Sequence, residues 1–443
     1  MSQSAPARLV AAAPWWRPGP ARRLVIRGGR PLAGTYRISG AKNAVLPLMV
    51  SALLTPHLVT LRNVPASLDV AVLAALLQRL GAVLHWSSTA DGLSLTVSAD
   101  RIDPDRLDGE LVGRMRASVL LLGALLARTG RAALPMPGGD AIGLRGIDFH
   151  LTGLRAMGAD IALEGGTIHA RAPRGLRAAE IHLPLPSVGA TENLMLAAAA
   201  ADGTTVIRNA AREPEIADLG LCLAEMGVAV GGIGTDVVTV GGGNPLRGVV
   251  HAVMPDRIEM GTLACAAAAT GGEMLLRHGR MDLLAAAAPV LAAAGVDMRA
   301  AEGGVRVCRA SAGLSGVDIV TMPHPGFATD LQAPAMALLA TASGVSAITE
   351  TIFEQRFRHV DELRRMGASI SVRRQTALVR GVPRLAGAPV TATDVRAAAA
   401  LVIAGLGAAG ETVLDGLDHL DRGYDRMAER LAACGADIAW ADD

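Results

Sequence analysis

The stretch LRAMGADIAL, residues 154–163, predicts a helix that ends at Gly158 and is followed at once by a short strand. A glycine just past the last apolar position is a typical helix end, because glycine adopts the left-handed conformation without steric penalty. The pattern recurs at LLQRLGAVLHW (76–86), LAEMGVAVGG (223–232), LAAAGVDMRA (291–300), LRRMGASISV (363–372) and LAACGADIAW (431–440). Its glycines are 68 to 77 residues apart, which is too long for a solenoid repeat and predicts a small α/β module used six times.

Each predicted module contains a second helix, which is apolar on nearly all sides. Its six versions are AVLPLMVSALL (44–54), ASVLLLGALLA (117–127), TENLMLAAAAA (191–201), GTLACAAAA (261–269), LQAPAMALLATA (331–342) and AAAALVIAGLGAA (397–409). A helix without a polar face has to be buried on every side, so six of them predict two bundles of three, each enclosed by strands and amphipathic helices. The longest apolar runs are shorter than the roughly 20 residues that a transmembrane helix needs, so no membrane span is expected.

The composition is that of a folded globular protein, because 51% of the 443 residues are hydrophobic and 19% are charged. Basic and acidic residues nearly balance, 42 against 41, and aromatic residues make up 2%, so neither nucleic acid nor an anionic membrane is an expected partner. Cys222, Cys265, Cys308 and Cys434 lack metal-ligand spacing, so no zinc site is expected. Residues 1–20 hold four prolines and no signal-peptide pattern, and we expect a disordered tail on a cytoplasmic protein.

Polar residues gather where the apolar helices begin. They are Lys42 and Asn43, Arg116, Ser187 to Gly189, Asp256 with Arg257 and Glu259, Thr329 with Asp330, and Asp394 with Arg396. N-capping explains Ser187 and Thr329, but cations at a helix N-terminus oppose its dipole. Lys42, Arg116 and Arg396 therefore indicate a ligand with several negative charges. Lys42 is also the only lysine among the 42 basic residues, which indicates a site where arginine would not serve.

The segment LPMPGGDAIGLR (134–145) is too rich in glycine and proline for a helix or strand. Gly138 and Gly139 give the carboxyl group of Asp140 mobility, as on a lid that closes over a substrate. An aspartate after two glycines is most often an ordinary turn residue, so this signal is weak on its own.

Ten ordered motifs resemble those of the UDP-N-acetylglucosamine 1-carboxyvinyltransferases, a branch of the enolpyruvyl transferase family. They are ISGAKNAVLPL (38–48), RMRASVLLLGALLA (114–127), PGGDAIGLRGIDFH (137–150), PSVGATENLML (186–196), NAAREPEI (209–216), MPDRIEMGT (254–262), PHPGFATDLQ (323–332), ITETIFEQRF (348–357), ATDVRA (392–397) and DRGYDRM (421–427). The resemblance implies an α/β fold, the two-domain inside-out barrel or prism, with three modules per domain around a cleft. It also implies a discontinuous first domain, residues 21–41 and 252–443, and a second domain, residues 42–251, that carries the 134–146 loop.

The resemblance further implies a reaction and its residues. The enolpyruvyl group of phosphoenolpyruvate would pass to the 3-hydroxyl of UDP-N-acetylglucosamine by addition and elimination, releasing phosphate, in the first committed step of peptidoglycan synthesis. Asp140 would be the general acid, Asp330 the base or the group that orients the hydroxyl, and Lys42 a further catalytic group. Phosphoenolpyruvate would be bound by Lys42, Asn43, Arg145, Arg396 and Arg422. The nucleotide sugar would be bound by Arg116, Arg145, Gly146, Ile147, Asp148, Phe149, Ser187, Val188, Gly189, Asp330 and Ile352. No metal or cofactor is implied.

Asp140 departs from the majority of the family, which has a cysteine there that the epoxide fosfomycin alkylates. A minority has aspartate, so the resemblance implies an active enzyme that is insensitive to fosfomycin. Three alternatives stay open: 3-phosphoshikimate 1-carboxyvinyltransferase, a transferase for another nucleotide acceptor, and an inactive regulatory paralogue. The first usually has serine after the lysine, where this chain has Asn43, and intact Asp330, Arg396 and Arg422 argue against the third.

Overall fold

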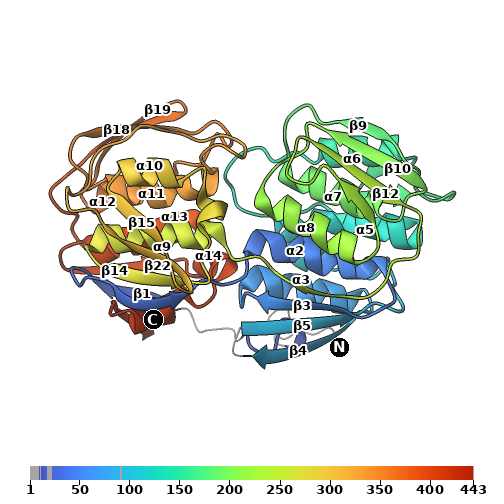
Figure 1. Cartoon of the computed structure of the whole chain (residues 1–443), viewed down its shortest axis with the longest axis horizontal. Helices are drawn as coiled ribbons and strands as arrows, with labels where there is room; N and C mark the ends of the chain where they lie inside the picture. The colour runs from blue at the N-terminus through green and yellow to red at the C-terminus, as the bar shows by residue number, and fades with distance from the viewer. Residues whose placement is uncertain (1–8, 10, 17–21, 90–91, 443) are drawn as a thin grey trace. The chain divides into compact units, whose positions relative to one another are not determined.

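The computed structural model describes residues 9, 11–16, 22–89 and 92–442, and it divides into two compact units (Figure 1). Unit 1 comprises Met1–Pro18, Gly40–Asp140 and Arg145–Met254, and unit 2 comprises Gly19–Ser39, Ala141–Leu144 and Pro255–Asp443.

Two details of this division differ from the expected domain bounds. Residues 40, 41 and 252–254 group with unit 1, where the backbone N–H of Ala41 donates a hydrogen bond to the carbonyl of Met254 at 2.7 Å. Ala141–Leu144 group with unit 2, although the resemblance implies that the whole loop belongs to the second domain, residues 42–251.

Unit 1 contains three sheets over the residues that the structure describes. Their strand orders are β13-β3-β5-β4, β6-β8-β7 and β11-β12-β10-β9. The strands are β3 (Val59–Val64), β4 (Val83–Thr89), β5 (Gly92–Ser98), β6 (Arg131–Pro135), β7 (Asp160–Glu164), β8 (Thr167–Arg171), β9 (Glu180–His182), β10 (Gly203–Arg208), β11 (Ala229–Gly231), β12 (Val237–Gly242) and β13 (Val249–Ala252). The helices are α2 (Lys42–Ser51), α3 (Leu68–Arg79), α4 (Gly109–Gly113), α5 (Leu120–Thr129), α6 (Asp148–Ala156), α7 (Val188–Ala198) and α8 (Pro214–Glu225).

Unit 2 likewise contains three sheets within the described residues, in the orders β15-β16-β14-β2, β17-β18-β20-β19 and β21-β22-β1-β23. The strands are β1 (Arg22–Arg27), β2 (Ala33–Arg37), β14 (Glu273–Arg277), β15 (Val296–Ala301), β16 (Gly304–Arg309), β17 (Ile319–Val320), β18 (Val345–Thr349), β19 (Ser369–Arg373), β20 (Thr376–Arg380), β21 (Pro389–Thr391), β22 (Glu411–Asp415) and β23 (Asp437–Asp442). The helices are α9 (Arg257–Thr270), α10 (Ala288–Ala293), α11 (Gln332–Leu339), α12 (Val360–Arg365), α13 (Val395–Gly407), α14 (Asp418–Gly423) and α15 (Met427–Ala433). Figure 1 shows the first strand, β1, beside β22 near the end of the chain, and the two pair antiparallel from Leu24 opposite Leu414 to Arg27 opposite Glu411.

The six predicted helix ends are confirmed. Each repeat glycine has a positive φ, between 90° and 105°, and lies two residues after the end of α3, α6, α8, α10, α12 or α15. At Gly158, for example, the glycine N–H donates to the carbonyl of Arg155 and the next N–H, of Ala159, reaches back to Leu154. A strand then begins within two residues, so each module is a helix, a glycine-capped end and a sheet.

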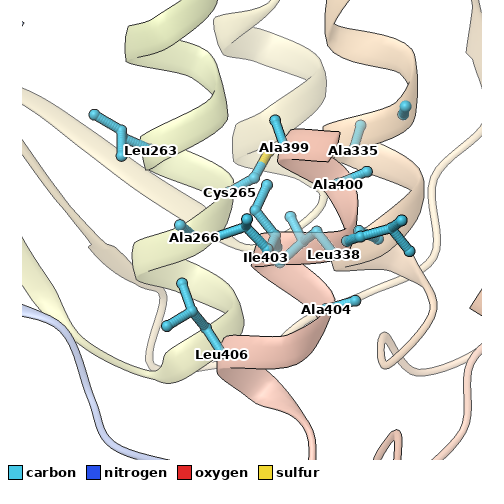
Figure 2. Packing of buried hydrophobic residues seen from close by; sticks show 14 of the residues in the cluster. Leu263, Cys265, Ala266, Ala335, Leu338, Ala399, Ala400, Ile403, Ala404 and Leu406 are labelled. Carbon is cyan, nitrogen blue, oxygen red and sulfur yellow. The ribbon is translucent and has the colours of Figure 1, made fainter. Parts of the chain in front are cut away.

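The apolar helices form the two cores. In unit 1, α2, α5 and α7 pack on one another, and in unit 2, α9, α11 and α13 do. Figure 2 shows the unit 2 core, where Cys265 and Ala266 of α9, Leu338 of α11, and Ala400 and Ile403 of α13 meet. Small side chains on facing helices let the backbones approach closely, and alanine is the most frequent residue of α9, α11 and α13.

The expectation of a disordered tail is wrong for residues 9 and 11–16. Leu9, Ala12 and Ala13 are buried, and the indole N–H of Trp86 donates to the carbonyl of Ala12 at 2.8 Å. The ring of Trp15 lies edge-on to that of Trp86, with centroids 5.6 Å apart. Apolar contact with β4 therefore orders a segment that has no periodicity of its own, and residues 1–8, 10 and 17–20 lie outside the described residues. Among the described helices, none is long and apolar enough to cross a membrane.

Candidate active site

Lys42 begins helix α2, and its ammonium group pairs with a buried carboxylate. Its Nζ lies 2.7 Å from Oδ2 of Asp69, in the first turn of α3. The side chain of Lys42 is 15% exposed and that of Asp69 is 3% exposed. Asn43 follows in the same helical turn. The only lysine of the chain therefore sits almost buried, with a small exposed part, at the start of a core helix.

Two arginines lie together beside the glycine-rich loop of unit 1. Arg116 begins a short 3-10 helix, and its Nη2 donates a hydrogen bond to the carbonyl of Gly146 at 2.5 Å. Burial and the charge of Arg145 lower the pKa of Arg116 to about 10. Gly139 has a φ of +122°, and a Cβ atom there would lie 3.0 Å from Cβ of Arg116 and 3.4 Å from Nη1 of Arg145, so any other residue before Asp140 would be strained. Two guanidinium groups so placed favour a ligand with more than one negative charge.

The predicted diphosphate segment is the start of helix α7. The Oγ of Ser187 accepts a hydrogen bond from a backbone N–H of the first turn at 3.4 Å, so Ser187 is an N-cap. Beneath Gly189 lies the buried ring of His150, whose Nδ1 is 3.0 Å from Nδ2 of Asn193. Burial, followed by the charge of Arg116, lowers the pKa of His150 to about 3. The imidazole is therefore neutral and supports the segment as a hydrogen-bonding group rather than as a cation.

The tip of the loop, Ala141–Leu144, is held by the segment after Ile352 within unit 2. The backbone N–H of Leu144 donates to Oε1 of Glu354 at 2.5 Å, and Nη1 of Arg358 donates to the carbonyl of Ala141 at 3.2 Å. The first of these bonds lowers the pKa of the Glu354 carboxyl.

Asp330 lies in a short 3-10 helix just before α11, between two guanidinium groups. Its Oδ1 accepts from Nη2 of Arg356 at 2.6 Å, and its Oδ2 accepts from Nη2 of Arg396 at 2.7 Å. Both arginine side chains are 5% exposed and that of Asp330 is 22% exposed. Burial opposes ionisation of Asp330, but Arg396 and Arg356 outweigh it and hold its pKa well below the usual range. Asp330 is a carboxylate at any physiological pH.

Arg396 is the second residue of α13. The carboxylate of Asp394 caps this helix, accepting from the N–H of Arg396 at 2.9 Å, and the guanidinium lies 5.5 Å from the ring centroid of Tyr424. A Cβ atom at Gly423 would be 3.7 Å from Nη1 of Arg396, so the end of α14, which carries Arg422, adjoins Arg396. The structure thus brings these two predicted cations into one region of unit 2.

The buried Glu350 links Ile352 to the segment of Asp330. Its Oε1 accepts from the backbone N–H of Ile352 at 2.8 Å and from Oγ1 of Thr321 at 2.9 Å. Its Oε2 accepts from Oγ1 of Thr329 at 2.8 Å. Thr329 is therefore not a side-chain cap, as the sequence suggested, but one of the groups that fix the position of its neighbour Asp330.

Comparison with known proteins settles the family. A family model described as EPSP synthase (3-phosphoshikimate 1-carboxyvinyltransferase) matches residues 26–431. UDP-N-acetylglucosamine 1-carboxyvinyltransferase of Acidiphilium cryptum (strain JF-5) is 55% identical over 416 residues, covering 94% of this chain and 98% of that relative. The protein of the same name from Rhodospirillum centenum (strain ATCC 51521 / SW) is 53% identical over 423 residues, with coverage of 94% and 98%. The chain belongs to the enolpyruvyl transferase family.

Solved structures place this enolpyruvyl transferase in the expected fold. The crystal structure of the enolpyruvyl transferase NikO from Streptomyces tendae has a TM-score of 0.85 and 27% identity, covering 96% of this chain and 100% of that one. EPSP synthase from Acinetobacter baumannii has a TM-score of 0.72 at 18% identity, covering 95% and 100%, and this likeness concerns the fold alone. The prediction of an α/β inside-out barrel with six modules is confirmed.

The predicted site residues of this enolpyruvyl transferase divide between its two units. Unit 1 holds Lys42, Asn43, Arg116, Asp140, Arg145, Gly146, Ile147, Asp148, Phe149, Ser187, Val188 and Gly189, and unit 2 holds Asp330, Ile352, Arg396 and Arg422. Sequence reasoning missed Asp69, His150, Glu350 and Arg356. His150, Glu350 and Arg356 lie inside quoted motifs, but a motif does not say which side chains meet. Asp69 lies outside all of the motifs. Over the described residues, no three His, Cys, Asp or Glu side chains are grouped so as to hold a metal ion.

Proposed function

We propose that this chain transfers the enolpyruvyl group of phosphoenolpyruvate to the 3-hydroxyl of UDP-N-acetylglucosamine, with release of phosphate, as the first committed step of peptidoglycan synthesis. The observation that carries the proposal is the identity of 50% or more, over nearly the full length, to relatives named for this activity. A cytoplasmic location stays a prediction.

The reaction determines what the residues have to do. In the addition step the sugar hydroxyl oxygen bonds to C2 of phosphoenolpyruvate, the hydroxyl loses its proton and C3 gains one. In the elimination step the bond from C2 to the phosphate oxygen breaks and C3 loses a proton, which restores the double bond. In this proposal Asp140, in its protonated form, donates the proton to C3. Lys42, Asn43, Arg145, Arg396 and Arg422 bind the phosphate and carboxylate of phosphoenolpyruvate.

The charge state of Asp330 decides between the two roles that the resemblance allows. A carboxylate whose pKa is held well below the usual range by Arg396 and Arg356 is a weak base, because proton transfer is most efficient when the catalytic pKa lies near the working pH. Asp330 is better suited to accept a hydrogen bond from the sugar hydroxyl and to orient its oxygen toward C2. Arg356, which binds the other carboxylate oxygen, is then part of the same orienting group.

The nucleotide sugar is the acceptor in this proposal. Arg116, Arg145 and the start of α7 offer cations and backbone N–H groups of the kind that bind a diphosphate. The segment Gly146 to Phe149 and Ile352 are assigned to the nucleotide and the sugar by the same resemblance.

The test is phosphate release from phosphoenolpyruvate with three acceptors: UDP-N-acetylglucosamine, shikimate 3-phosphate and UMP. Release with the first alone, and a product that gains the mass of an enolpyruvyl group, supports the proposal. Release only with shikimate 3-phosphate, or only with UMP, would assign the chain to another branch of the family. A folded protein without release for any acceptor would make it the inactive paralogue.

A further inference from the structure

The only lysine of this chain is held by a buried carboxylate from another helix. Lys42 begins α2, Asp69 lies in the first turn of α3, and these two helices pack on each other. The two charged atoms are 2.7 Å apart, within the range of a charge-assisted hydrogen bond. Asp69 is almost fully buried, whereas Lys42 is largely buried and keeps a small exposed part.

The stability of helix α2 does not account for this pair. Core helices α7, α9 and α13 begin with side-chain caps from Ser187, Asp256 and Asp394, but Ala41, before Lys42, supplies no such bond. A cation in the first turn also opposes the helix dipole. Buried ion pairs are weak contributors to stability, because desolvation offsets their attraction. The start of α2 is therefore built to place an ammonium group.

We propose that Asp69 is a positioning residue, whose carboxylate fixes the Lys42 ammonium where an anionic group of the substrate binds. An ammonium has three N–H donors, so it can hold Asp69 and a ligand oxygen at once. A guanidinium has a planar fork of donors and a larger head, and cannot keep both contacts in the same space. The inference rests on the proposed function only for the identity of that ligand, phosphoenolpyruvate.

A second carboxyl group, that of Glu192, also lies near Lys42, but it is less suited than Asp69 to bind the ammonium as an anion. Glu192 of α7 is buried, and burial, then Glu215 and Glu213, raise its pKa well above the usual range, against the opposing charge of Lys42. The raised pKa favours the uncharged acid, so Glu192 competes less than Asp69 as an anion for the ammonium. Replacing Asp69 should disturb Lys42, whereas neutralising Glu192 should not.

The single lysine allows a direct measurement. Protein grown with lysine labelled with ¹⁵N at Nζ has one side-chain ammonium signal, that of Lys42. In the wild type we expect this signal near neutral pH, because a hydrogen-bonded and largely buried ammonium exchanges its protons slowly. Addition of inorganic phosphate or phosphoenolpyruvate should shift it saturably. An ammonium that exchanges as fast as that of a solvent-exposed lysine in the wild type would overturn the proposal without any variant.

Asp69→Asn tests the pairing itself. We expect the ammonium signal to shift strongly or to be lost by exchange, and the KM for phosphoenolpyruvate to rise about tenfold or more, with the KM for UDP-N-acetylglucosamine nearly unchanged. Asp69→Glu should partly restore the ammonium signal and the KM for phosphoenolpyruvate. The matched control is Asp105→Asn, which removes an exposed ion pair of unit 1, 2.6 Å from Arg131, and should change neither.

The outcomes separate this inference from the proposed function. If the chain did not use phosphoenolpyruvate at all, the ammonium signal of the substrate-free protein would still differ between the wild type and Asp69→Asn. If Asp69→Asn kept both the wild-type signal and the wild-type KM, the positioning role would be wrong although the enzyme remained active. A variant that fails to fold is replaced in this comparison by Asp69→Glu.

Discussion

Asp330 in unit 2 and Glu192 in unit 1 are carboxyl groups at core helices, and the structure shifts their pKa values in opposite directions. Burial opposes the ionisation of Asp330, but Arg396 and Arg356 hold its pKa well below the usual range. Glu192 is 5% exposed, and its Oε1 has no hydrogen-bond partner among the described residues. Burial raises its pKa well above the usual range.

The difference shows that burial, helped by nearby carboxylates, raises the pKa of a carboxyl group, and that two adjacent guanidinium groups reverse this effect. The partners of Asp330 are 26 and 66 residues away in the sequence. In unit 1 the cation that acts on Glu192 is Lys42, and its ammonium is paired with Asp69 instead. We expect Asp330 to be essential for turnover and Glu192 to affect mainly the stability of the fold.

The largest expected effect is that of Asp330→Ala. Turnover should fall by about 10³-fold or more, because the group that orients the acceptor hydroxyl is lost. UDP-N-acetylglucosamine should still bind, more weakly, since its other contacts remain. The two guanidinium groups lose their buried partner, which costs on the order of 3 kcal/mol of the free energy of unfolding. Phosphate release, calorimetric titration with the nucleotide sugar and denaturant unfolding measure the three effects.

The matched control for this variant is Asp361→Ala, which removes an exposed ion pair of unit 2 with Arg364. It should leave turnover and stability nearly unchanged, because exposed pairs contribute little. Near-normal turnover of Asp330→Ala would contradict the assignment of the hydroxyl-orienting role to this residue.

Arg356→Met should raise the pKa of Asp330, which is the direction in which the pKa of Glu192 is shifted. With one guanidinium removed, burial is opposed by Arg396 alone and the pKa of Asp330 rises. The ionised form is the active one, so the acid limb of the pH–rate profile should shift to higher pH, with a further loss at neutral pH of about tenfold. A profile with an unchanged acid limb and a unit 2 that remains folded would show that Arg356 does not control the charge of Asp330.

The fold could be predicted from the sequence because it depends on local patterns. Glycines such as Gly158 mark helix ends by their backbone conformation alone. An alanine-rich helix without a polar face has to be buried in the core. The segment of residues 9 and 11–16 was wrongly predicted, because contact with Trp86, far along the chain, orders it.

The candidate site could be predicted only in part. Motifs identified Lys42, Asp330 and Arg396, but not which side chains they meet. Asp69 and Arg356 became visible only when folding brought their helices or loops beside those residues. The opposite pKa shifts of Asp330 and Glu192 depend on the same kind of long-range contact, which a sequence does not show.

Asp140 is a third carboxyl group, half-buried in the loop next to two arginines, and it is expected to tolerate replacement by cysteine. Asp140→Cys should keep activity within about tenfold at neutral pH, because a thiol is also a proton donor. The wild type should not react with fosfomycin, since a carboxyl group is a far weaker nucleophile toward an epoxide than a thiolate. The variant should be inactivated with time and gain the mass of one fosfomycin.

The native cysteines serve as the internal control for that experiment. None of the four lies in the 134–146 loop, and burial raises the pKa of Cys222 and Cys265 to about 12. Time-dependent inactivation of the wild type with a covalent adduct would therefore contradict the role of Asp140.

The smallest expected effect on activity is that of Glu192→Gln, which replaces a carboxyl group of raised pKa by a neutral amide of the same shape. Turnover should stay within about twofold of the wild type. The raised pKa means that the folded chain binds this proton more tightly than the unfolded chain, whose usual value is 4.5. The stabilisation is complete below that value and is lost as the pH rises toward the pKa of the folded state.

Thermal unfolding at pH 5, 7 and 9 should therefore show a Tm advantage of Glu192→Gln that grows with pH, whereas Glu164→Gln, at an exposed position, should follow the wild type. A large loss of turnover in Glu192→Gln would mean that Glu192 acts as a carboxylate like Asp330, and the contrast between the two units would fail.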